Sequence, residues 1–346
     1  MKAFRRFARK ERAAKLDDIP IPKPRNNEVL LRVNYCGICG SDLHAWLNHK
    51  GYESVLPEVT FGHELSGIVE ETGSDVINWK PGDRAVMIAL QTHYDVNDPY
   101  CVMDLPQLSS RRRVQGLHLN GGMAEFVCIE DEFLIPIPDG ISQELAALTE
   151  PLSVAEHCVG NRTDIGPGSN VVVSGPGIIG LLCAISARSR GAEVILVGTE
   201  KDEIMRLTAA RRIGFETLVV GPEYPPLNEQ ISTHFPDGAD TLVEASGSAV
   251  ALADSWKSVC PNGTVTAVAL YSRSIDFELT QFLRKQIDLR TSYASSMNDY
   301  HNAFKLLKDG SVDTSVLTQN YSLADAEKGF IDSENLAVTK VLLNCS

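Results

Sequence analysis

The chain has 346 residues, 43% of them hydrophobic, which is more than one core comfortably holds, so we expect two globular domains. Its formal net charge of −13 at pH 7 argues against nucleic acid or an anionic membrane as a partner. The N-terminus has no apolar signal segment, the most apolar stretch (171–185) is broken by glycine and proline, and the eight cysteines are mostly isolated. We therefore expect reduced thiols and a cytoplasmic protein.

The first 150 residues are predicted to be rich in β-strands. Short strands are expected at Val29–Val33 and Glu125–Ile129, and turns that lead into strands are expected at Pro81–Val86 and Asn120–Phe126. Few segments in this part have a long helical period.

The string CGICGSDLH (Cys36–His44) contains the first candidate metal ligand, Cys39. A lone cysteine is most often a small buried thiol, but the surrounding residues favour a ligand here. Cys36 and Cys39 also form a C-x-x-C pair, which occurs in redox motifs and in closed zinc sites. A closed site needs a second such pair nearby, and the sequence has none, so we interpret Cys36 as structural.

The string GHELSG supplies His63 and Glu64, and the string EPLS supplies Glu150. Neighbouring residues of a regular strand point to opposite faces, so His63 and Glu64 can reach one metal only if Gly62 lets the backbone bend. Glu64 is then either a direct ligand or a hydrogen-bonding partner of a ligand. Glu150 precedes Pro151, and its carboxylate could simply stabilise the N-terminus of a helix.

A thiolate, an imidazole and carboxylates around one ion, with one ligand position open, are typical of catalytic zinc. Such a zinc acts as a Lewis acid on a substrate hydroxyl, while a nicotinamide accepts hydride from the carbon. Five of the histidines outside these strings are interpreted as ordinary surface or core residues, namely His49, His93, His118, His234 and His301.

From Asn170 onward, apolar runs alternate with helical patterns. The expected strands are Val171–Ser174, Val194–Val197, Thr217–Val220, Thr241–Ala245 and Thr264–Leu270, and the expected helices are Ile178–Arg190 and Glu203–Ile213. This alternation predicts βαβ units and a parallel, doubly wound sheet. After about Tyr293 the pattern returns to helix and loop, with a final strand at Val338–Leu343.

A glycine-rich turn, G-x-G-x-x-G, follows the first of these strands directly. Its glycines are Gly175, Gly177 and Gly180, and Ile178 and Ile179 open the next helix. Glycines allow the tight turn and let a pyrophosphate approach the helix N-terminus closely. Between a strand and a helix, this pattern predicts a dinucleotide site.

The type of dinucleotide depends on the end of the next strand. NAD enzymes place an acidic residue there, about 20 residues beyond the glycines, to bind the ribose hydroxyls. The strand runs into Gly198, Thr199, Glu200 and Lys201. Glu200 could bind the ribose, whereas Thr199, Lys201 and Arg206 could instead hold the 2′-phosphate of NADP. We favour NAD.

Together these strings resemble the zinc-dependent medium-chain dehydrogenase/reductase family, which includes the alcohol dehydrogenases, and above all its sorbitol and polyol dehydrogenases. The resemblance spans nearly the whole chain. It implies an α/β protein with a GroES-like catalytic zinc domain, residues 1–152 and 294–346, and an inserted Rossmann dinucleotide-binding domain, residues 153–293. It also implies homodimers or homotetramers that assemble through the edge of the Rossmann sheet.

The resemblance also implies roles for individual residues. Cys39 and His63 would be zinc ligands, with Glu64 a ligand in at least some states and Glu150 near the zinc directly or through water. Ser41 would take the substrate proton and pass it outward towards His44. Asp42 would orient the His63 imidazole. Ser246, Val268 and Leu270 would line the nicotinamide half of the cofactor site.

Two features of the chain bear on this resemblance. Many relatives carry a second, structural zinc held by four cysteines, but between residues 86 and 121 this chain has only Cys101, so we expect a single catalytic zinc and no structural zinc. Trp46 is a candidate wall of the substrate pocket, and an equally good candidate for a core aromatic residue.

The resemblance predicts a zinc-dependent oxidoreductase that transfers hydride between NAD(P) and a secondary alcohol of a polyol, sugar or sugar-acid derivative. Two alternatives stay open at this point. One is oxidation of an amino alcohol, as in threonine dehydrogenases. The other is a catalytically silent relative that binds NADPH and acts structurally.

Overall fold

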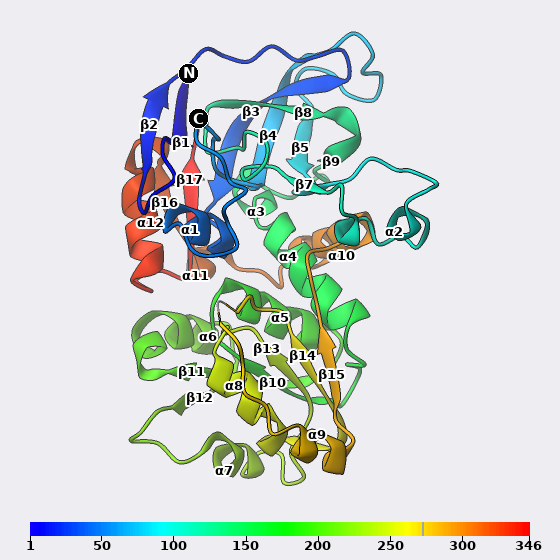
Figure 1. Ribbon diagram of the computed structural model, residues 1–346, viewed down its shortest axis with the longest axis vertical. Coiled ribbons are helices and arrows are strands. Elements are labelled where there is room, and N and C mark those ends of the chain that lie inside the picture. The colour runs from blue at the N-terminus through cyan, green and yellow to red at the C-terminus, as the bar shows by residue number, and fades with distance from the viewer. Residues whose placement is uncertain (272) are drawn as a thin grey trace. The chain divides into compact units, whose positions relative to one another are not determined.

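The computed structural model describes residues 1–271 and 273–346, and they form two compact units. Unit 1 consists of Met1–Glu150, Ser296–Lys308 and Thr318–Ser346, and unit 2 consists of Pro151–Ser295 and Asp309–Leu317. Part of the range 294–346 therefore packs with unit 2, because helix α11 (Thr314–Leu317) contacts helix α6 (Thr208–Arg212). Figure 1 follows the chain by colour and labels its elements.

Unit 1 is built on a sheet whose central strand is β3 (Glu28–Gly37). Strand β4 (Glu64–Thr72) pairs antiparallel with one edge of β3. The other edge is shared, because β8 (Phe126–Glu130) pairs with the first residues of β3 and β17 (Lys340–Asn344) pairs with its last residues. The C-terminal strand therefore lies beside the end of β3 that leads into the CGICGSDLH string.

The complete sheet of unit 1 has the order β16-β17-β3-β4-β5-β9, with β8 paired to β3. Its remaining strands are β5 (Arg84–Met87), β9 (Leu134–Pro136) and β16 (Thr318–Ser322). Two small sheets pair β1 (Lys2–Arg6) with β2 (Ala14–Asp18), and β6 (Leu90–Gln91) with β7 (Arg113–Val114). The α-helices are α1 (Gly40–Trp46), α2 (Pro99–Val102), α3 (Gln143–Ala146), α10 (Met297–Lys308) and α12 (Ala326–Glu334), and α4 (Thr149–Glu156) begins here. The 3₁₀ turns are Pro106–Leu108, Asp131–Phe133 and Leu323–Asp325.

Unit 2 contains a six-stranded parallel sheet in the order β12-β11-β10-β13-β14-β15, which confirms the predicted doubly wound sheet. The strands are β10 (Asn170–Ser174), β11 (Glu193–Thr199), β12 (Glu216–Val220), β13 (Ala239–Glu244), β14 (Val259–Ala267) and β15 (Asp288–Thr291). The central strand β10 is buried from Val171 to Ser174, as expected for a parallel strand that is covered on both faces. The strand order reverses between β10 and β13, and ligands of such sheets bind where this reversal occurs.

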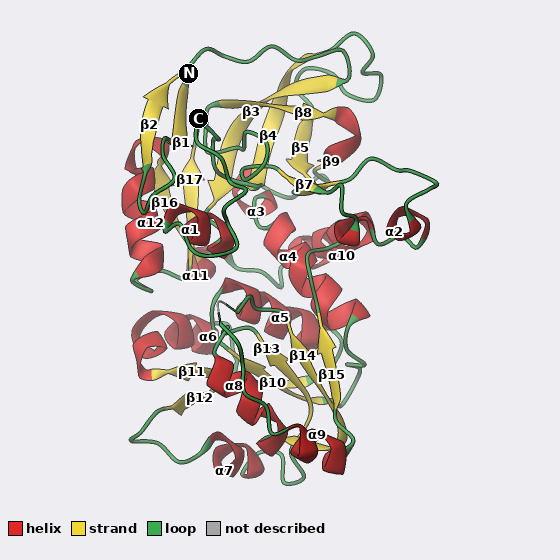
Figure 2. Ribbon diagram, viewed as in Figure 1, coloured by secondary structure: helices red, strands yellow, loops and turns green. Residues whose placement is uncertain are grey.

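Helices connect these strands (Figure 2). They are α5 (Ile178–Ser189), α6, α7 (Leu227–Ser232), α8 (Ala249–Asp254) and α9 (Leu279–Lys285), whereas α11 follows the last strand of this sheet. Short 3₁₀ and π-helical turns occupy His157–Asn161, Glu200–Asp202, Glu203–Leu207 and Ser255–Lys257. Among the described residues, no helix combines the length and the apolar character that crossing a membrane requires.

Three differences from the sequence-based expectation stand out in unit 2. The strand expected to reach Leu270 ends at Ala267, because the N–H groups of Val268 and Ala269 both point to the Glu244 carbonyl, at 3.0 and 3.3 Å. The helix expected from Glu203 begins with π-helical turns before α6. Strand β15 was not expected, because its sequence, DLRT, is largely polar, as suits an exposed edge strand.

Candidate active site

Helix α1 positions the first group of candidate residues. Cys39 is its N-cap, and the Cys39 N–H donates to the carboxylate of Asp42 at 3.0 Å, which holds the first turn. Ser41 and His44 are three residues apart, so they project from the same side of the helix. Asp42 is fully buried beneath this turn.

Gly62 places the second group. Its φ of +98° lies in the region that favours glycine, and a Cβ here would lie 2.5 Å from the Cys36 sulfur. This bend lets the neighbours His63 and Glu64, which are 4% and 1% exposed, both face Cys39. Cys36 is fully buried against the bend and its thiol points to the Gly37 carbonyl. The surroundings of Cys36 therefore fit a residue that packs the bend at Gly62.

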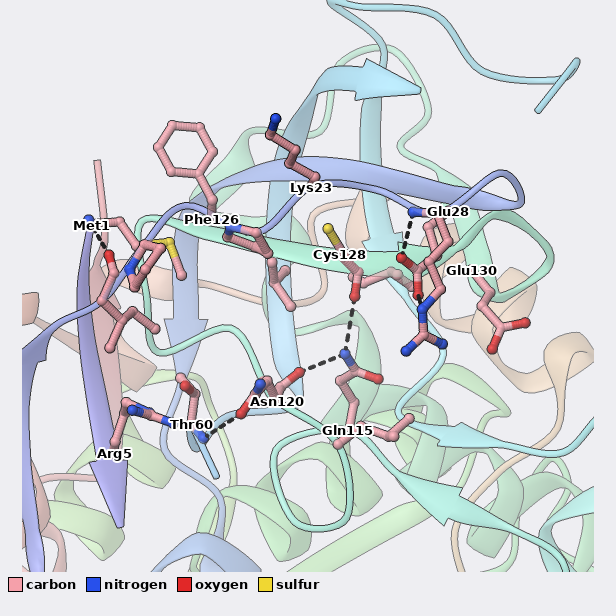
Figure 3. Close-up of a pocket in the computed structure, with 18 of the residues that line it drawn as sticks. Met1, Arg5, Lys23, Glu28, Thr60, Gln115, Asn120, Phe126, Cys128 and Glu130 are labelled. Atoms are coloured by element: carbon pink, nitrogen blue, oxygen red, sulfur yellow. Dashed lines mark hydrogen bonds and ion pairs between the residues drawn. The ribbon is translucent and has the colours of Figure 1, made fainter. Parts of the chain in front are cut away.

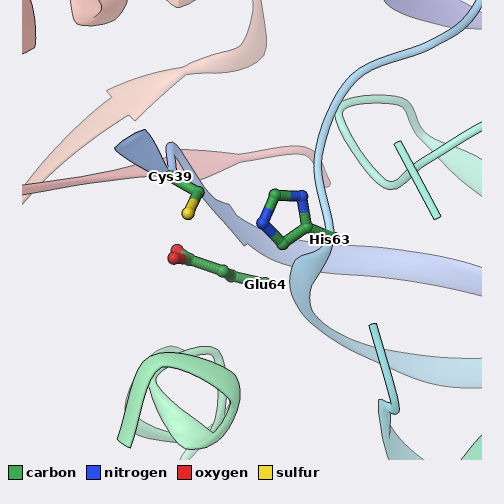
Figure 4. A group of neighbouring side chains, drawn as sticks. All are labelled: Cys39, His63 and Glu64. Atoms are coloured by element: carbon green, nitrogen blue, oxygen red, sulfur yellow. The ribbon is translucent and has the colours of Figure 1, made fainter. Parts of the chain in front are cut away.

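Cys39, His63 and Glu64 form a compact cluster of possible metal ligands (Figure 4). Their ligand atoms all lie within 4.8 Å of one another. Zinc binds sulfur, nitrogen and oxygen at about 2.0–2.3 Å, so ligands of one tetrahedral ion lie within about 4 Å of one another. A small inward adjustment of these side chains would therefore accommodate a zinc ion.

The two ring nitrogens of His63 face different partners. Nδ1 lies 3.6 Å from Asp42 Oδ1, and Nε2 lies 3.3 Å from the hydroxyl of Ser41. Histidine ligands of zinc usually donate their second N–H to a carboxylate or carbonyl, which fixes the tautomer. Asp42 suits that role, in which case Nε2 would be the ligand nitrogen and Ser41 would lie beside the metal.

The electrostatics of the cluster favour a cation. When ionised, Asp42, Glu64 and Glu150 carry three negative charges, and Lys340 supplies one positive charge. Burial raises the pKa of Glu150 to about 7, with Glu64 adding to the effect and His63 opposing it. Burial alone would lower the pKa of His63, but Asp42, Cys39 and Glu150 raise it well above the usual value. Surroundings that stabilise an imidazolium also stabilise a divalent metal, so the donor set and its charge fit zinc.

Lys340, at the start of β17, is a site residue that sequence reasoning missed. It is 2% exposed, its ammonium group donates to the Ile38 carbonyl at 2.9 Å, and it forms an ion pair with Glu64. Burial would lower the pKa of Lys340, but Glu64 and the neighbouring acidic groups outweigh burial and raise it. The pair fits only because Gly37 lacks a Cβ, which would lie 2.1 Å from a Glu64 oxygen. Lys340 is nearly 280 positions from Glu64, and no local motif marks it.

The glycine turn of unit 2 lies between β10 and α5, as expected. Gly175 has a φ of +100°, and a Cβ there would meet the backbone of Ser246 at 2.6 Å. A Cβ on Gly180 would lie 1.9 Å from the Gly175 carbonyl oxygen, whereas a Cβ on Gly177 would meet nothing within 4 Å. Gly175 and Gly180 therefore permit the turn itself, and Gly177 leaves open space at the N-terminus of α5, where Ile178 and Ile179 form the first turn.

The other candidate cofactor residues follow the carboxyl ends of neighbouring parallel strands and therefore lie along one edge of the sheet. Ser246 follows β13, and Val268 and Leu270 follow β14. The Leu270 carbonyl lies 3.1 Å from the position of a Cβ on Gly247, so these two loops are adjacent.

Glu244 and Tyr271 tie these loops together. The Glu244 carboxylate is fully buried and accepts from the Ser246 N–H at 2.9 Å, from the Ser246 hydroxyl and from the Tyr271 hydroxyl. Tyr271 is a second residue that the motifs did not single out.

The residues after β11 are arranged around a local cap. The Thr199 N–H and hydroxyl both donate to the Asp202 carboxylate, at 2.9 and 2.8 Å. The other oxygen of Asp202 lies 3.5 Å from the Arg206 guanidinium. Glu200 and Lys201 are exposed. Arg206 and Thr199 are thus already engaged by Asp202, whereas the Glu200 carboxylate faces solvent beyond the end of the strand.

Two other features of unit 1 lie apart from the cluster. His93 contacts Glu132 through Nδ1, at 2.6 Å, and Glu130 through Nε2, at 3.6 Å, so its two nitrogens serve different carboxylates at an exposed position. Trp46 is 1% exposed and packs against the ring of Phe330 at 5.3 Å, which makes it a core residue.

A cavity of about 480 Å³ lies beside β8 (Figure 3). Two of its acidic groups are engaged, since Glu28 lies 3.9 Å from Arg25 and Glu130 lies 4.0 Å from Arg113. The Gln115 side chain donates to the Asn120 carbonyl at 2.6 Å, as the figure shows. The cavity shares no lining residue with the metal cluster.

Comparisons with known families agree with this geometry. Residues 25–139 match the alcohol dehydrogenase GroES-like domain, and residues 179–309 match the zinc-binding dehydrogenase domain. The chain is thus a two-part dehydrogenase with a GroES-like domain and a Rossmann-like domain, as predicted. It belongs to the zinc-dependent medium-chain dehydrogenase family, in the group of the polyol dehydrogenases.

Individual relatives place the chain more closely. It is 32% identical to the sorbitol dehydrogenase of Halalkalibacterium halodurans over 330 residues, covering 94% of this chain and 93% of the relative. It is 30% identical to the D-arabitol-phosphate dehydrogenase of Enterococcus avium, over 90% of this chain and 88% of the relative. Among solved structures, 2R,3R-butanediol dehydrogenase from Bacillus subtilis superposes with a TM-score of 0.88 at 26% identity, with 99% of each chain covered.

Proposed function

We propose that this protein oxidises a secondary alcohol of a polyol, sugar or sugar-acid derivative reversibly, with NAD(P) as the hydride acceptor. The observation that carries the proposal is the buried cluster of Cys39, His63 and Glu64, whose ligand atoms lie within 4.8 Å of one another in acidic surroundings. Relatives that are named for sorbitol and arabitol phosphate support a polyol substrate. Bound by these three residues, zinc would supply Lewis acidity to the substrate hydroxyl.

The residues around the cluster account for proton movement. The Ser41 hydroxyl, 3.3 Å from His63 Nε2, is placed to accept the proton that the substrate hydroxyl loses. His44, on the same side of α1, would carry this proton outward. Glu150 is the third catalytic candidate, because its buried carboxyl group interacts electrostatically with His63 and Glu64 of the cluster. Asp42 would keep His63 in the tautomer that leaves Nε2 free.

The residues of unit 2 account for cofactor binding. The pyrophosphate would lie at Gly177 and the N-terminus of α5, where a Cβ would meet no protein atom within 4 Å. The loops after β13 and β14, with Ser246, Val268 and Leu270, would line the nicotinamide half. These loops would orient the nicotinamide, which would supply the hydride acceptor when bound.

For the cofactor we propose NAD. Glu200 offers an exposed carboxylate for the ribose hydroxyls, and the positive charge of Arg206 is already balanced by Asp202 at 3.5 Å. NADP is the competing choice, because a similar solved structure, a putative zinc-binding dehydrogenase from Sinorhizobium meliloti, has NADP bound. It is 27% identical to this chain and superposes with a TM-score of 0.90, covering 99% of this chain and 98% of its own. Dissociation constants of NADH and NADPH, measured by fluorescence for wild type and Glu200→Ala, decide between them. A tenfold preference of wild type for NADPH, about 1.4 kcal/mol, would overturn the assignment.

A substrate panel tests the reaction itself. Zinc-loaded protein should reduce NAD(P) with at least one polyol or sugar acid, and Ser41→Ala should lower turnover strongly while leaving the NADH dissociation constant unchanged. The panel includes L-threonine, because the chain is 29% identical over 332 residues to an L-threonine 3-dehydrogenase of Xanthomonas campestris. Activity with threonine alone would replace the polyol assignment, and normal turnover in Ser41→Ala would remove Ser41 from the mechanism.

We further propose a cytoplasmic homodimer or homotetramer that assembles through β15. This strand lies at one edge of the unit 2 sheet, and Leu289 within it is 45% exposed. An edge strand presents unpaired backbone N–H and C=O groups, which favour pairing with a second copy. Light scattering should give a multiple of the 37.8 kDa chain mass, and Leu289→Arg should reduce it. A monomeric wild type would contradict this assembly.

A further inference from the structure

His49 makes a close contact with the candidate relay residue His44. The Nδ1 atoms of the two rings are 2.8 Å apart, and the rings are tilted by 47° with centroids 5.1 Å apart. The His49 N–H donates to the His44 carbonyl at 3.0 Å, so the turn that ends α1 places the second ring. His44 also stacks against Tyr52, with ring centroids 5.6 Å apart. Backbone and ring packing thus both hold the imidazole pair together.

A contact of 2.8 Å between two ring nitrogens requires a shared proton. One Nδ1 must donate and the other must accept, because two lone pairs or two N–H groups would repel each other at this distance. The Nε2 atom of each ring is then left to exchange a proton with another group. His44 is partly buried and His49 is exposed, so the pair leads from the interior of unit 1 to solvent.

We propose that His49 is the outer member of a proton relay that runs from Ser41 through His44 to His49 and solvent. The inference rests on the proposed function, in which Ser41 receives the substrate proton, and it extends the relay by one residue that touches His44 directly. His49 was interpreted from the sequence as an ordinary histidine, because it lies outside every motif.

The transfer balances. The proton enters at His44 Nε2, the proton on His44 Nδ1 crosses to His49 Nδ1, and the proton on His49 Nε2 leaves to water. The total charge of the pair does not change, and exchange with water restores the starting tautomers. Burial, followed by the effect of His49, lowers the pKa of His44, which favours the neutral ring with an unprotonated nitrogen that can accept a proton.

The test compares His49→Gln with wild type and with His301→Gln, all loaded with zinc and NAD(P) and given the alcohol that wild type oxidises fastest in the panel. His301 is also exposed and, within the described part of the chain, bonds only to the backbone carbonyl of Met297, so it controls for loss of a surface imidazole. Proton release in a single turnover, followed with a pH indicator in weak buffer, should slow roughly tenfold in His49→Gln alone. Added imidazole should restore the rate in a saturable way.

A residue that only positions His44 would behave differently. Imidazole in solution would then fail to rescue His49→Gln, and the relay would be wrong at this step. Normal proton release in His49→Gln would also overturn the role of His49 in the relay. If release were still slow in Ser41→Ala, the proposed function would nevertheless stand. Normal release in Ser41→Ala would instead remove the relay from the proposed function as well.

A second readout needs no turnover. Through-hydrogen-bond coupling between ¹⁵N nuclei of His44 and His49, in metal-free protein labelled at histidine, should show one proton shared between the two Nδ1 atoms. Its absence would contradict the shared proton on which the relay depends.

Discussion

Cys36 and Cys39 are three residues apart, and the fold gives them different surroundings. Cys39 is partly buried and faces His63 and Glu64, whereas Cys36 is fully buried against the bend at Gly62. Burial raises the pKa of Cys36 well above its usual value, with Cys345 and nearby acidic groups adding to the effect. The sulfur of Cys39 belongs to the cluster of possible ligand atoms and that of Cys36 does not, so of the two thiols Cys39 is the one placed to hold zinc.

Substitution of the two cysteines should separate these roles. Cys39→Ser should lose bound zinc and activity together, whereas Cys36→Ser should keep near-normal zinc content and lose at most some thermal stability. Elemental analysis of dialysed protein, with activity on the same samples, measures both. Equal loss of zinc in the two variants would show that the C-x-x-C pair acts as a unit.

The ion pair of Lys340 with Glu64 should stabilise the metal-free protein. Lys340→Met leaves a buried carboxylate without its counter-charge, a change that typically costs about 3–5 kcal/mol. Zinc supplies positive charge at the same carboxylate, so the loss should be smaller in the zinc-loaded protein. Thermal unfolding of both forms of wild type and variant checks this. An equal fall in Tm in the two forms would show that Lys340 acts independently of the metal site.

At the scale of elements, the turn between β10 and α5 has two kinds of glycine. Gly180 has no room for a Cβ, because the Gly175 carbonyl would lie 1.9 Å from it. A Cβ on Gly177 would meet no protein atom within 4 Å, and any residue can adopt its φ of −66°. The first is needed for the turn, and we propose that the second leaves space for the pyrophosphate.

Alanine at each glycine should therefore give different results. Gly180→Ala should lower both Tm and NADH affinity, because the start of α5 must move. Gly177→Ala should leave Tm unchanged yet weaken NADH binding at least tenfold, or about 1.4 kcal/mol, because the methyl group occupies the space of the pyrophosphate. Calorimetry and fluorescence titration provide the two measurements. Unchanged NADH affinity in Gly177→Ala would place the pyrophosphate elsewhere.

For the whole molecule, the prediction is one tightly bound zinc per chain. Only the cluster of Cys39, His63 and Glu64 combines burial with a thiolate and an imidazole among the described residues, whereas the group of His93, Glu130 and Glu132 is more exposed and its nitrogens face different carboxylates. Elemental analysis should give one zinc in wild type and in His93→Ala. Two tightly bound ions in wild type, or none after metal loading, would contradict this stoichiometry.

Much of the fold could be predicted from local patterns in the sequence. The apolar runs at Val171–Ser174 and Val194–Val197 predicted β10 and β11, because a central parallel strand is buried on both faces and its sequence is apolar throughout. Strand β15 escaped prediction because an edge strand can be polar. The end of β14 was placed too late, because a hydrogen bond to Glu244, a distant residue, terminates it.

The residues of the candidate site also fall into two groups, those that local sequence patterns located and those that only the three-dimensional contacts revealed. Cys39, His63, Glu64 and the three glycines could be located from short strings, because each motif needs particular residue types at a fixed local spacing. Lys340, Tyr271 and the partnership of His44 with His49 required three-dimensional contacts. The Lys340 ammonium reaches Glu64 only because β17 pairs with the end of β3, and the shared proton of the two histidines depends on a 2.8 Å approach that the turn after α1 creates. Residue type and spacing specify which chemistry is present, but which charges and protons interact depends on distances set by packing.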